Sequence, residues 1–199
     1  MVYAGLDYSI SCPCICIYDT DTGPFIHKNC IYYFCQGNAS LKEIERRKRL
    51  NLDNIFCSYQ YKWKETYHRY FSLADFFLSI IFQHSVEHVA MEDYALNASG
   101  RVFDIAECTG ILKYLIVLSG ITFSVFSPTL VKKTFSGKGN ANKEQMVNAY
   151  LMRYNVSIPH LFEKENHFES PISDIVDSHA MLYTYFNGDK NGTRIFQRN

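Results

Sequence analysis

The sequence predicts an α/β fold in which helices cover both faces of a mixed five-stranded sheet. Near the amino end, three short apolar segments follow one another with only short turns between them, which is typical of an antiparallel meander. From residue 73 onward, helical and strand patterns alternate, which is typical of β-α-β units. The 199 residues are 47% hydrophobic and 20% charged, which suffices for one core. We therefore expect a single domain over residues 1–199.

The predicted meander begins with Val2–Leu6, an almost continuously apolar strand that ends at Asp7. Cys12–Tyr18 is the second strand, in which alternating cysteines place small apolar side chains on one face. A turn at 19–24 leads into the third strand, Phe25–Cys35, which is rich in Ile, Tyr and Phe.

Residues 37–70 differ in character, and we expect them to form an insertion or lid that is partly helical. They contain a charged run at Lys42–Arg49 and an aromatic and basic stretch at Tyr59–Lys64. Either segment could contact phosphates or unstacked nucleotides. A run of charges is more often the solvated face of a helix, and we favour this interpretation for both segments.

The remainder of the chain supplies two more strands and four helices. Strands are expected at Val86–Asp93 and Ile121–Phe126. Asn142 is followed three residues later by Gln145, which predicts a helix start with a capping box. The helices are expected at 73–83, at 99–119 with Ser99 as its cap and Gly120 as its end, at 143–154 and at 171–186, and the polar tail after residue 187 is expected to fray.

Composition limits the compartment and the partners. Seven cysteines cannot all pair within one chain, and the amino end lacks the pattern of a signal peptide, so we expect a reduced, cytoplasmic protein, or one in the host cytoplasm if the source is viral. Cys30 and Cys35 do not supply the second short-spaced pair of a zinc site, and none is expected. No stretch is long and apolar enough to span a membrane. Acidic and basic residues number 20 each, so net charge indicates no partner.

Four acidic residues stand out by position. Asp7 and Glu92 each end an apolar strand, where an unpaired buried carboxylate would cost several kcal/mol. Asp174 and Asp177 are three residues apart at the start of a helix, which places both on one helical face. Each acid alone has a simple structural explanation, as a turn former or a helix-terminal charge. Together they predict a site for two divalent cations, Mg²⁺ or Mn²⁺, of the kind that hydrolyses phosphodiesters.

The order of these acids, in Gly5-Leu-Asp7, Met91-Glu-Asp-Tyr94 and Asp174–Ala180, resembles the RuvC-type Holliday junction resolvases of the RNase H-like superfamily. The block Phe126–Met146 resembles that family's Lys- and Gly-rich segment before the last acids, whereas residues 37–70 have no counterpart there. The resemblance implies an RNase H-like fold, a homodimer and two ions held by Asp7, Glu92, Asp174 and Asp177. It also implies that Lys132 and Lys143 are functional lysines, with Lys143 acting beside the acids, and that Tyr94 is the aromatic residue that opens the junction.

A positive surface for DNA is expected between Glu107 and Glu144, where no acidic residue occurs. The loop 136–142 contains two glycines that let backbone N–H groups approach phosphate closely. An ordinary exposed loop is the alternative. The lysines expected to contact DNA are Lys132, Lys133, Lys138 and Lys143.

Three functions are consistent with these observations. The first is an endonuclease that cuts Holliday junctions and other branched DNA. The second is an RNase H-like nuclease that acts on hybrids, flaps or single strands. The third is an inactive RNase H-like module that binds nucleic acid, against which the four intact acids argue. We favour the first.

Overall fold

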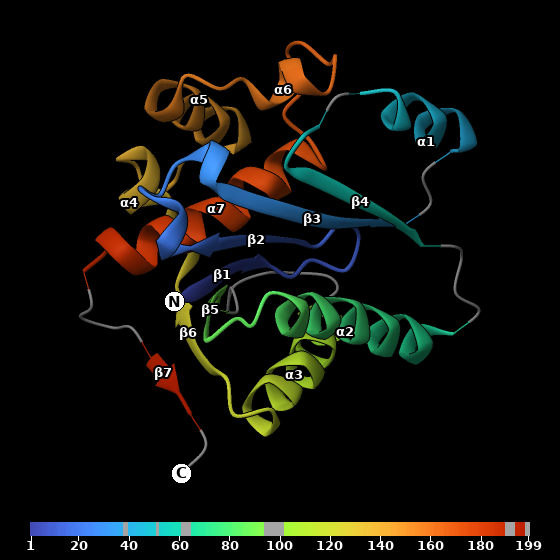
Figure 1. Ribbon diagram of the computed structural model, residues 1–199, viewed down its shortest axis with the longest axis vertical. Helices are drawn as coiled ribbons and strands as arrows, with labels where there is room; N and C mark the ends of the chain where they lie inside the picture. Colours follow the sequence, from blue (N-terminus) through green and yellow to red (C-terminus); the bar gives the residue numbers. More distant parts are fainter. Residues whose placement is uncertain (38–39, 51, 61–64, 94–101, 190–193, 198–199) are drawn as a thin grey trace.

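The structure is a computed structural model, and it describes residues 1–199 except 38–39, 51, 61–64, 94–101, 190–193 and 198–199. Its centre is a seven-stranded mixed sheet in the order β4-β3-β2-β1-β5-β6-β7 (Figure 1). β1 (Val2–Asp7), β2 (Cys14–Asp19) and β3 (Cys30–Gly37) pair antiparallel. β5 (His88–Glu92) pairs parallel to β1, and β6 (Thr122–Phe126) pairs parallel to β5. These five strands confirm the predicted mixed sheet.

Two edge strands are not among those predicted. β4 (Ile55–Gln60) pairs parallel to β3, so this part of the expected insertion extends the sheet. β7 (Arg194–Phe196) pairs antiparallel to β6, so the expectation that the tail frays is wrong for these residues. β4 pairs with the strand that precedes it in the sequence, and β7 has only three residues. A local pattern of alternating residues gives little indication of such edge pairing.

Helices cover both faces of the sheet, as predicted (Figure 1). α2 (Thr66–Gln83) and α3 (Val102–Leu118) pack on one face and enclose one apolar core with the sheet. The helices of the other face enclose a second core, and α7 contributes buried residues along most of its length. These are α4 (Pro128–Ser136), α5 (Lys143–Tyr154), the short α6 (Ile158–Leu161) and α7 (Ile172–Asn187).

The helix boundaries test the predicted caps. Asn142 and Gln145 form the expected capping box at the start of α5. α2 begins at Thr66, seven residues before the predicted start at 73. α4 is not among the predicted helices, although its start at Ser127 and Pro128 is a common one. The predicted cap of α3, Ser99, lies outside the described residues.

α1 (Leu41–Lys48) is held against the molecule by ion pairs. Glu43 accepts hydrogen bonds from Arg46 at 3.0 Å and Arg47 at 2.8 Å, and it pairs with Lys164 at 3.2 Å. These partners lower the pKa of Glu43 to about 2. Arg47 is only 5% exposed, and its guanidinium lies over two phenylalanine rings. The prediction that the charged run is the solvated face of a helix is therefore wrong for Arg47. Its role here is to anchor α1. The predicted aromatic and basic stretch lies largely outside the described residues.

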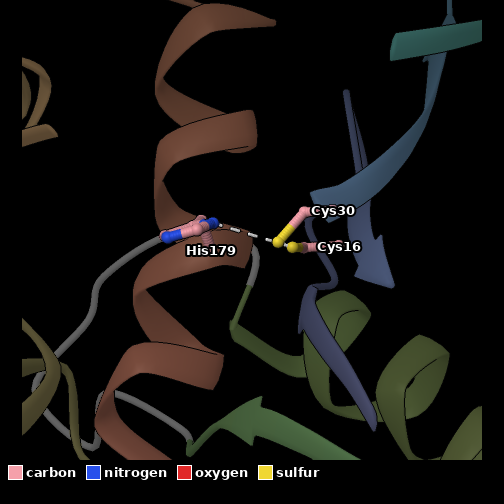
Figure 2. Close-up of side chains that lie close together, drawn as sticks. All are labelled: Cys16, Cys30 and His179. Carbon is pink, nitrogen blue, oxygen red and sulfur yellow. Dashed lines mark hydrogen bonds between the residues drawn. The ribbon is translucent and has the colours of Figure 1, made fainter. Parts of the chain in front are cut away.

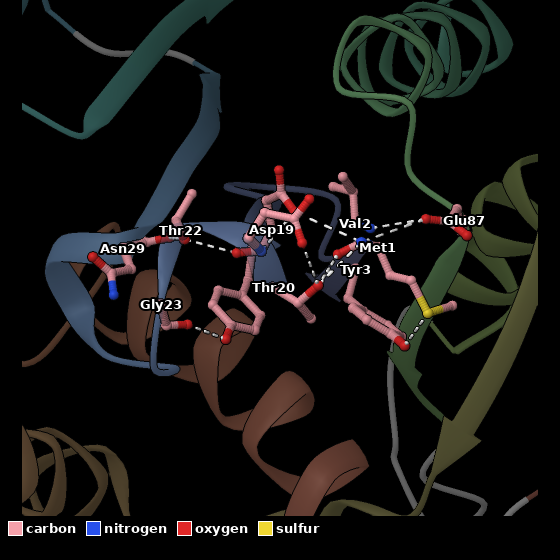
Figure 3. Close-up of polar contacts among 11 residues, drawn as sticks. Met1, Val2, Tyr3, Asp19, Thr20, Thr22, Gly23, Asn29 and Glu87 are labelled. Carbon is pink, nitrogen blue, oxygen red and sulfur yellow. Dashed lines mark hydrogen bonds and ion pairs between the residues drawn. The ribbon is translucent and has the colours of Figure 1, made fainter.

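Short polar contacts fix the end of the sheet opposite the acidic strand ends (Figure 3). The backbone N–H of Val2 donates to Glu87 at 3.1 Å, which ties the start of β1 to the residue before β5. The Tyr18 hydroxyl donates to the Gly23 carbonyl at 2.5 Å and closes the turn after β2. These contacts hold the register in which β1 and β5 run side by side. Within the described part of the chain, no helix is both long and apolar enough to cross a membrane.

α7 crosses β1 at very close range. A Cβ atom added to Gly5 would lie 2.1 Å from the backbone oxygen of Ser178. Only glycine permits this approach, because any side chain would push the helix away from the strand. Gly5 lies two residues before Asp7, and Ser178 lies one residue after Asp177. Their contact therefore sets how near the end of β1 lies to the acidic turn of α7.

Candidate active site

Asp7 and Glu92 are the last residues of two neighbouring parallel strands, β1 and β5. Leu6 is paired with Met91, so the two acids leave the sheet side by side at the same edge. Carboxyl ends of adjacent parallel strands are where α/β proteins commonly place ligand sites. The sequence-based placement of both acids at strand ends is confirmed.

Asp174 and Asp177 reach the same place from the first two turns of α7. Burial raises the pKa of the Asp7 carboxyl well above its usual range, and Asp174, Asp177 and Glu92 raise it further, in that order. Electrostatic coupling of this kind requires short separations in a poorly hydrated setting. The structure thus gathers all four predicted acids in one site.

The pKa values of two further acids, Glu92 and Asp177, are also raised. Burial raises the pKa of Glu92 to about 7, although Lys132 acts in the opposite direction. Burial also raises the pKa of Asp177 to about 7, and the charges of Glu92 and Asp174 add to this effect. The main cause is the same for both, since burial disfavours the ionised form of a carboxyl where water is excluded. A cluster of this kind gains most from a bound cation.

The chemistry of the donors fits hard divalent cations. Asp174 is 7% exposed, and its Oδ2 atom has no hydrogen-bond partner among the described residues, so one buried ligand oxygen is available. Oxygen donors of this type suit Mg²⁺ and Mn²⁺. No three of the four acids bring ligand oxygens within 4.8 Å of one another in the described structure. The carboxylates are therefore spread more widely than the shell of one small ion.

Lysines partly neutralise this negative site. Lys143 is the first residue of α5, where it forms an ion pair with Glu169. Glu169, together with Asp174 and Asp177, raises the pKa of Lys143. Lys132 lies on α4 and lowers the pKa of both Glu92 and Asp177. The two lysines that the resemblance singled out are thus both coupled to the acids.

The remaining predicted contacts lie further from the acids. Lys133 and Lys138 are exposed, on α4 and in the loop that follows it. The loop is braced by Ser136, whose hydroxyl accepts from the backbone N–H of Lys138 at 3.3 Å. Tyr94 lies outside the described residues.

Comparison with known proteins identifies the relatives of this arrangement. The family model "Crossover junction endodeoxyribonuclease RuvC" matches residues 51–160, just over half of the chain. The chain belongs to the RuvC family. The crossover junction endodeoxyribonuclease RuvC of a Nitratiruptor species is 36% identical over 111 residues, which are 54% of this chain and 63% of that relative. The chain therefore aligns with less than two thirds of this relative's length.

Two solved structures share the fold. The T. thermophilus RuvC in complex with Holliday junction substrate has a TM-score of 0.61 at 15% identity and covers 94% of this chain and 93% of its own. The Thermus thermophilus RuvC structure has a TM-score of 0.53 at 14% identity, and the match covers 95% of this chain and 99% of that structure's chain. RuvC-family proteins are divalent-metal-dependent endonucleases. The family match contains Glu92 but not the other three acids, whose assignment depends on their position in the fold.

A cavity of about 180 Å³ opens beside the acids and was not evident from the sequence. Asp7 and Glu92 line one side of it, and apolar residues of α3 line another. The only indication of this cavity in the sequence was the apolar character of α3. No local polar motif in α3 indicated that the helix lines the site. This cavity gives the RuvC-family site a partly apolar wall next to its carboxylates.

Sequence reasoning also missed a buried group behind the acids. Cys16, Cys30 and His179 place their ligand atoms within 4.8 Å of one another, the only such group among the described residues. His179 is fully buried, as expected for a core residue. The three residues come from three separate segments, so their spacing in the sequence carried no signal.

Proposed function

We propose that this chain is a structure-selective endonuclease that resolves four-way DNA junctions by metal-dependent phosphodiester hydrolysis. One observation carries the proposal: four carboxylates from β1, β5 and α7, one of them buried and three half-buried, meet at one sheet edge in a RuvC-family chain. A structural role would not need four mutually repelling acids, because they destabilise the folded state unless a cation is present. An enzyme with this activity works where the cell keeps its DNA, and we propose a cytoplasmic location for this chain.

Asp7, Glu92, Asp174 and Asp177 would hold two divalent ions, Mg²⁺ or Mn²⁺. When bound, two such ions supply a nucleophilic hydroxide from water and neutralise charge on the leaving oxygen. Four carboxylates are enough for two ions, since one Mg²⁺ is usually held by one or two carboxylates and keeps several water ligands. The acids must release their protons to bind, so Glu92 and Asp177, with pKa values of about 7, set the pH range of loading.

The lysines complete the binding surface. Lys143 and Lys132 are close enough to influence the acids and are positioned to meet the negative charge of a phosphodiester at the site. Lys133 and Lys138 extend the positive surface along α4 and its loop, where they would contact phosphates without reading sequence. Tyr94 is proposed as the junction-opening aromatic residue by family resemblance alone.

A second copy of the chain is the proposed protein partner. Paired cuts on two opposing strands need two sites related by a two-fold axis. α3 supports this, because its sequence is mostly apolar while Phe103 is 83% exposed and Tyr114 is 66% exposed. Large apolar side chains exposed along one helix are typical of an interaction surface. A partner helix from a second copy would bury this exposed side.

The decisive experiment compares the wild type with Asp7→Asn on a labelled immobile four-way junction in Mg²⁺. We expect paired nicks across the junction from the wild type. Asp7→Asn should retain junction binding and lose cutting by more than the ~10–100-fold that loss of an outer-sphere partner costs. Asp53→Asn, which alters an exposed aspartate away from the site, is the matched control and should cut normally.

Other outcomes identify the alternatives. A flap, an RNA–DNA hybrid and a linear duplex are tested in parallel. Preferential cutting of the hybrid or the flap would replace the resolvase with a nuclease of another specificity. Binding without cutting in both Mg²⁺ and Mn²⁺ would refute the nuclease proposal and leave an inactive module.

A further inference from the structure

Three potential metal ligands lie together in the core beneath α7 (Figure 2). Cys16 is in β2, Cys30 begins β3 and His179 is in the middle of α7, and each is 0% exposed. Figure 2 shows both sulfur atoms and one imidazole nitrogen pointing toward a common centre. This group belongs to neither the acidic site nor the proposed DNA surface.

We propose that Cys16, Cys30 and His179 bind a zinc ion. Zn²⁺ takes sulfur ligands at ~2.3 Å and nitrogen ligands at ~2.0–2.1 Å, which at a tetrahedral angle places S and N about 3.6 Å apart. The observed separation of Cys16 Sγ and His179 Nδ1 is 3.8 Å. All three ligand atoms lie within 4.8 Å of one another. The Cys16–His179 pair therefore lies within a few tenths of an ångström of the spacing that an ion would impose.

The charge of the group suits a buried ion. Binding would release the two thiol protons, and two thiolates with a neutral imidazole then balance the two positive charges of Zn²⁺. A neutral complex avoids the large penalty of an isolated charge in an apolar core. Thiolate and imidazole donors select zinc over the hard ions that the acidic site takes.

A fourth ligand is also within reach. The Tyr32 hydroxyl lies 2.9 Å from His179 Nδ1, on the same side as the sulfurs. It belongs to a chain of hydroxyls, since Tyr32 contacts the Tyr150 hydroxyl at 2.8 Å and Tyr150 contacts His27 Nδ1 at 2.7 Å. Tyr32 or a water molecule would complete the four-coordinate shell typical of structural zinc.

The surrounding rings hold the imidazole in the orientation that a metal needs. Phe25 stacks on His179 with centroids 4.3 Å apart, and Tyr150 and Tyr154 meet the ring edge-on at 5.0 and 4.8 Å. Nδ1 is thereby directed at the sulfurs. Nε2 has no hydrogen-bond partner among the described residues, whereas Nδ1 contacts the Tyr32 hydroxyl at 2.9 Å and Cys16 Sγ at 3.8 Å. The polar contacts of this ring are therefore made on the side of the sulfurs.

The ion would tie together the elements that carry the acids. His179 lies two residues after Asp177 on α7, while the two cysteines lie on β2, which is adjacent to β1, and on β3, the next strand along. A zinc ion in this position links α7 directly to β2 and β3. Because the site is closed, it would load as the chain folds and would contribute to stability, not to the chemistry of cutting.

The test measures zinc directly in protein produced with zinc in the medium and purified without chelator. We expect about one zinc ion per chain by elemental analysis, retained in excess Mg²⁺, which competes for carboxylate sites but not for thiolates. Protein refolded with Co²⁺ alone should show the sulfur-to-metal charge-transfer absorption that only thiolate ligation produces. Zn²⁺ added during refolding should raise the Tm by about 5–10 °C at ~100-fold excess over the Kd.

Variants locate the ion. Cys16→Ser and Cys30→Ser should each lose the bound zinc, whereas Cys35→Ser should retain it. Cys35 is the matched control because it is equally buried in β3 but packs in the core on the opposite face of the sheet. Absence of zinc from the wild type, with no charge-transfer band and no change in Tm, would overturn the proposal. Zinc that Mg²⁺ displaces or that both serine variants retain would overturn it as well, since that ion would lie elsewhere.

Discussion

The Glu92 carboxyl illustrates how single residues of the site oppose folding. Its pKa is raised from 4.5 to about 7 by burial, so the folded chain holds a proton that the unfolded chain releases. The stability that the protonated Glu92 carboxyl contributes is therefore fully present below pH 4.5 and is lost as the pH rises through about 7. Asp177, raised from 3.8 to about 7, acts in the same direction. Metal-free protein should accordingly be less stable at pH 8 than at pH 5.

Glu92→Gln should relieve this effect. Without metal at pH 8, we expect the variant to be more stable than the wild type by on the order of 1–3 kcal/mol, because one unit of pKa shift corresponds to ~1.4 kcal/mol. Mg²⁺ should reverse the order, stabilising the wild type more than the variant. Denaturant unfolding at pH 5 and pH 8, once in chelator and once in excess Mg²⁺, measures both effects.

Glu45→Gln, at an exposed position of α1, is the matched control and should change little. A Glu92→Gln variant that is less stable than the wild type at pH 8 without metal would contradict the assigned electrostatics.

At the scale of elements, the crossing of α7 over β1 is the contact that builds the site. Gly5→Ala should destabilise the fold by about 3 kcal/mol or more, since the added Cβ would lie 2.1 Å from a backbone oxygen of Ser178 that cannot rotate away. The variant should also lose metal-dependent stabilisation, because α7 carries two of the acids. Thermal unfolding with and without Mg²⁺ gives both quantities.

Gly110→Ala supplies the control for this substitution. A Cβ at Gly110 meets no described atom within 4 Å, and the residue lies inside α3. We expect a gain of about 0.5–1 kcal/mol from the better helix propensity of alanine. Equal stability of Gly5→Ala and the wild type would show that α7 does not approach β1 so closely.

Which elements could be predicted follows from the range of the interactions that form them. The α5 cap was readable because Asn142 and Gln145 satisfy each other within one turn. β1 and β5 were readable because uninterrupted apolar strands end abruptly at Asp7 and Glu92. β4 and β7 were missed because edge strands carry a weak local pattern, and β7 has only three residues.

The same reasoning separates the parts of the site. The acids were identifiable as a set from their places at strand and helix ends, because each one alone also has a simple structural explanation. Their convergence required the fold, and so did the pairing of Lys143 with Glu169, 26 residues away. The group of Cys16, Cys30 and His179 spans 163 residues between its first and last members, so no motif spacing could indicate it.

At the scale of the whole molecule, the exposed side of α3 is the feature that a lone chain leaves unexplained. Phe103, Glu107, Gly110 and Tyr114 fall at i, i+4, i+7 and i+11 and therefore share one helical face, which is apolar except for the exposed Glu107. Leu118, 50% exposed, continues it by one turn. The small Gly110 in its centre would let a second helix approach closely. We therefore expect the proposed dimer to form through this face.

Gly110→Arg tests the dimer without disturbing the chain itself. An arginine has room on the surface of α3 in the single chain, since a Cβ there meets no described atom within 4 Å, and arginine is a good helix former. In a helix–helix interface the same side chain would be a buried, unpaired charge, which costs several kcal/mol and should dissociate the dimer. Light scattering at micromolar concentration should give a dimer for the wild type and Gly110→Ala, and a monomer for Gly110→Arg. On a four-way junction the arginine variant should then make single nicks where the wild type makes paired ones, since each monomer brings one site. A Gly110→Arg protein that remains dimeric and cuts both strands together would place the interface on another face.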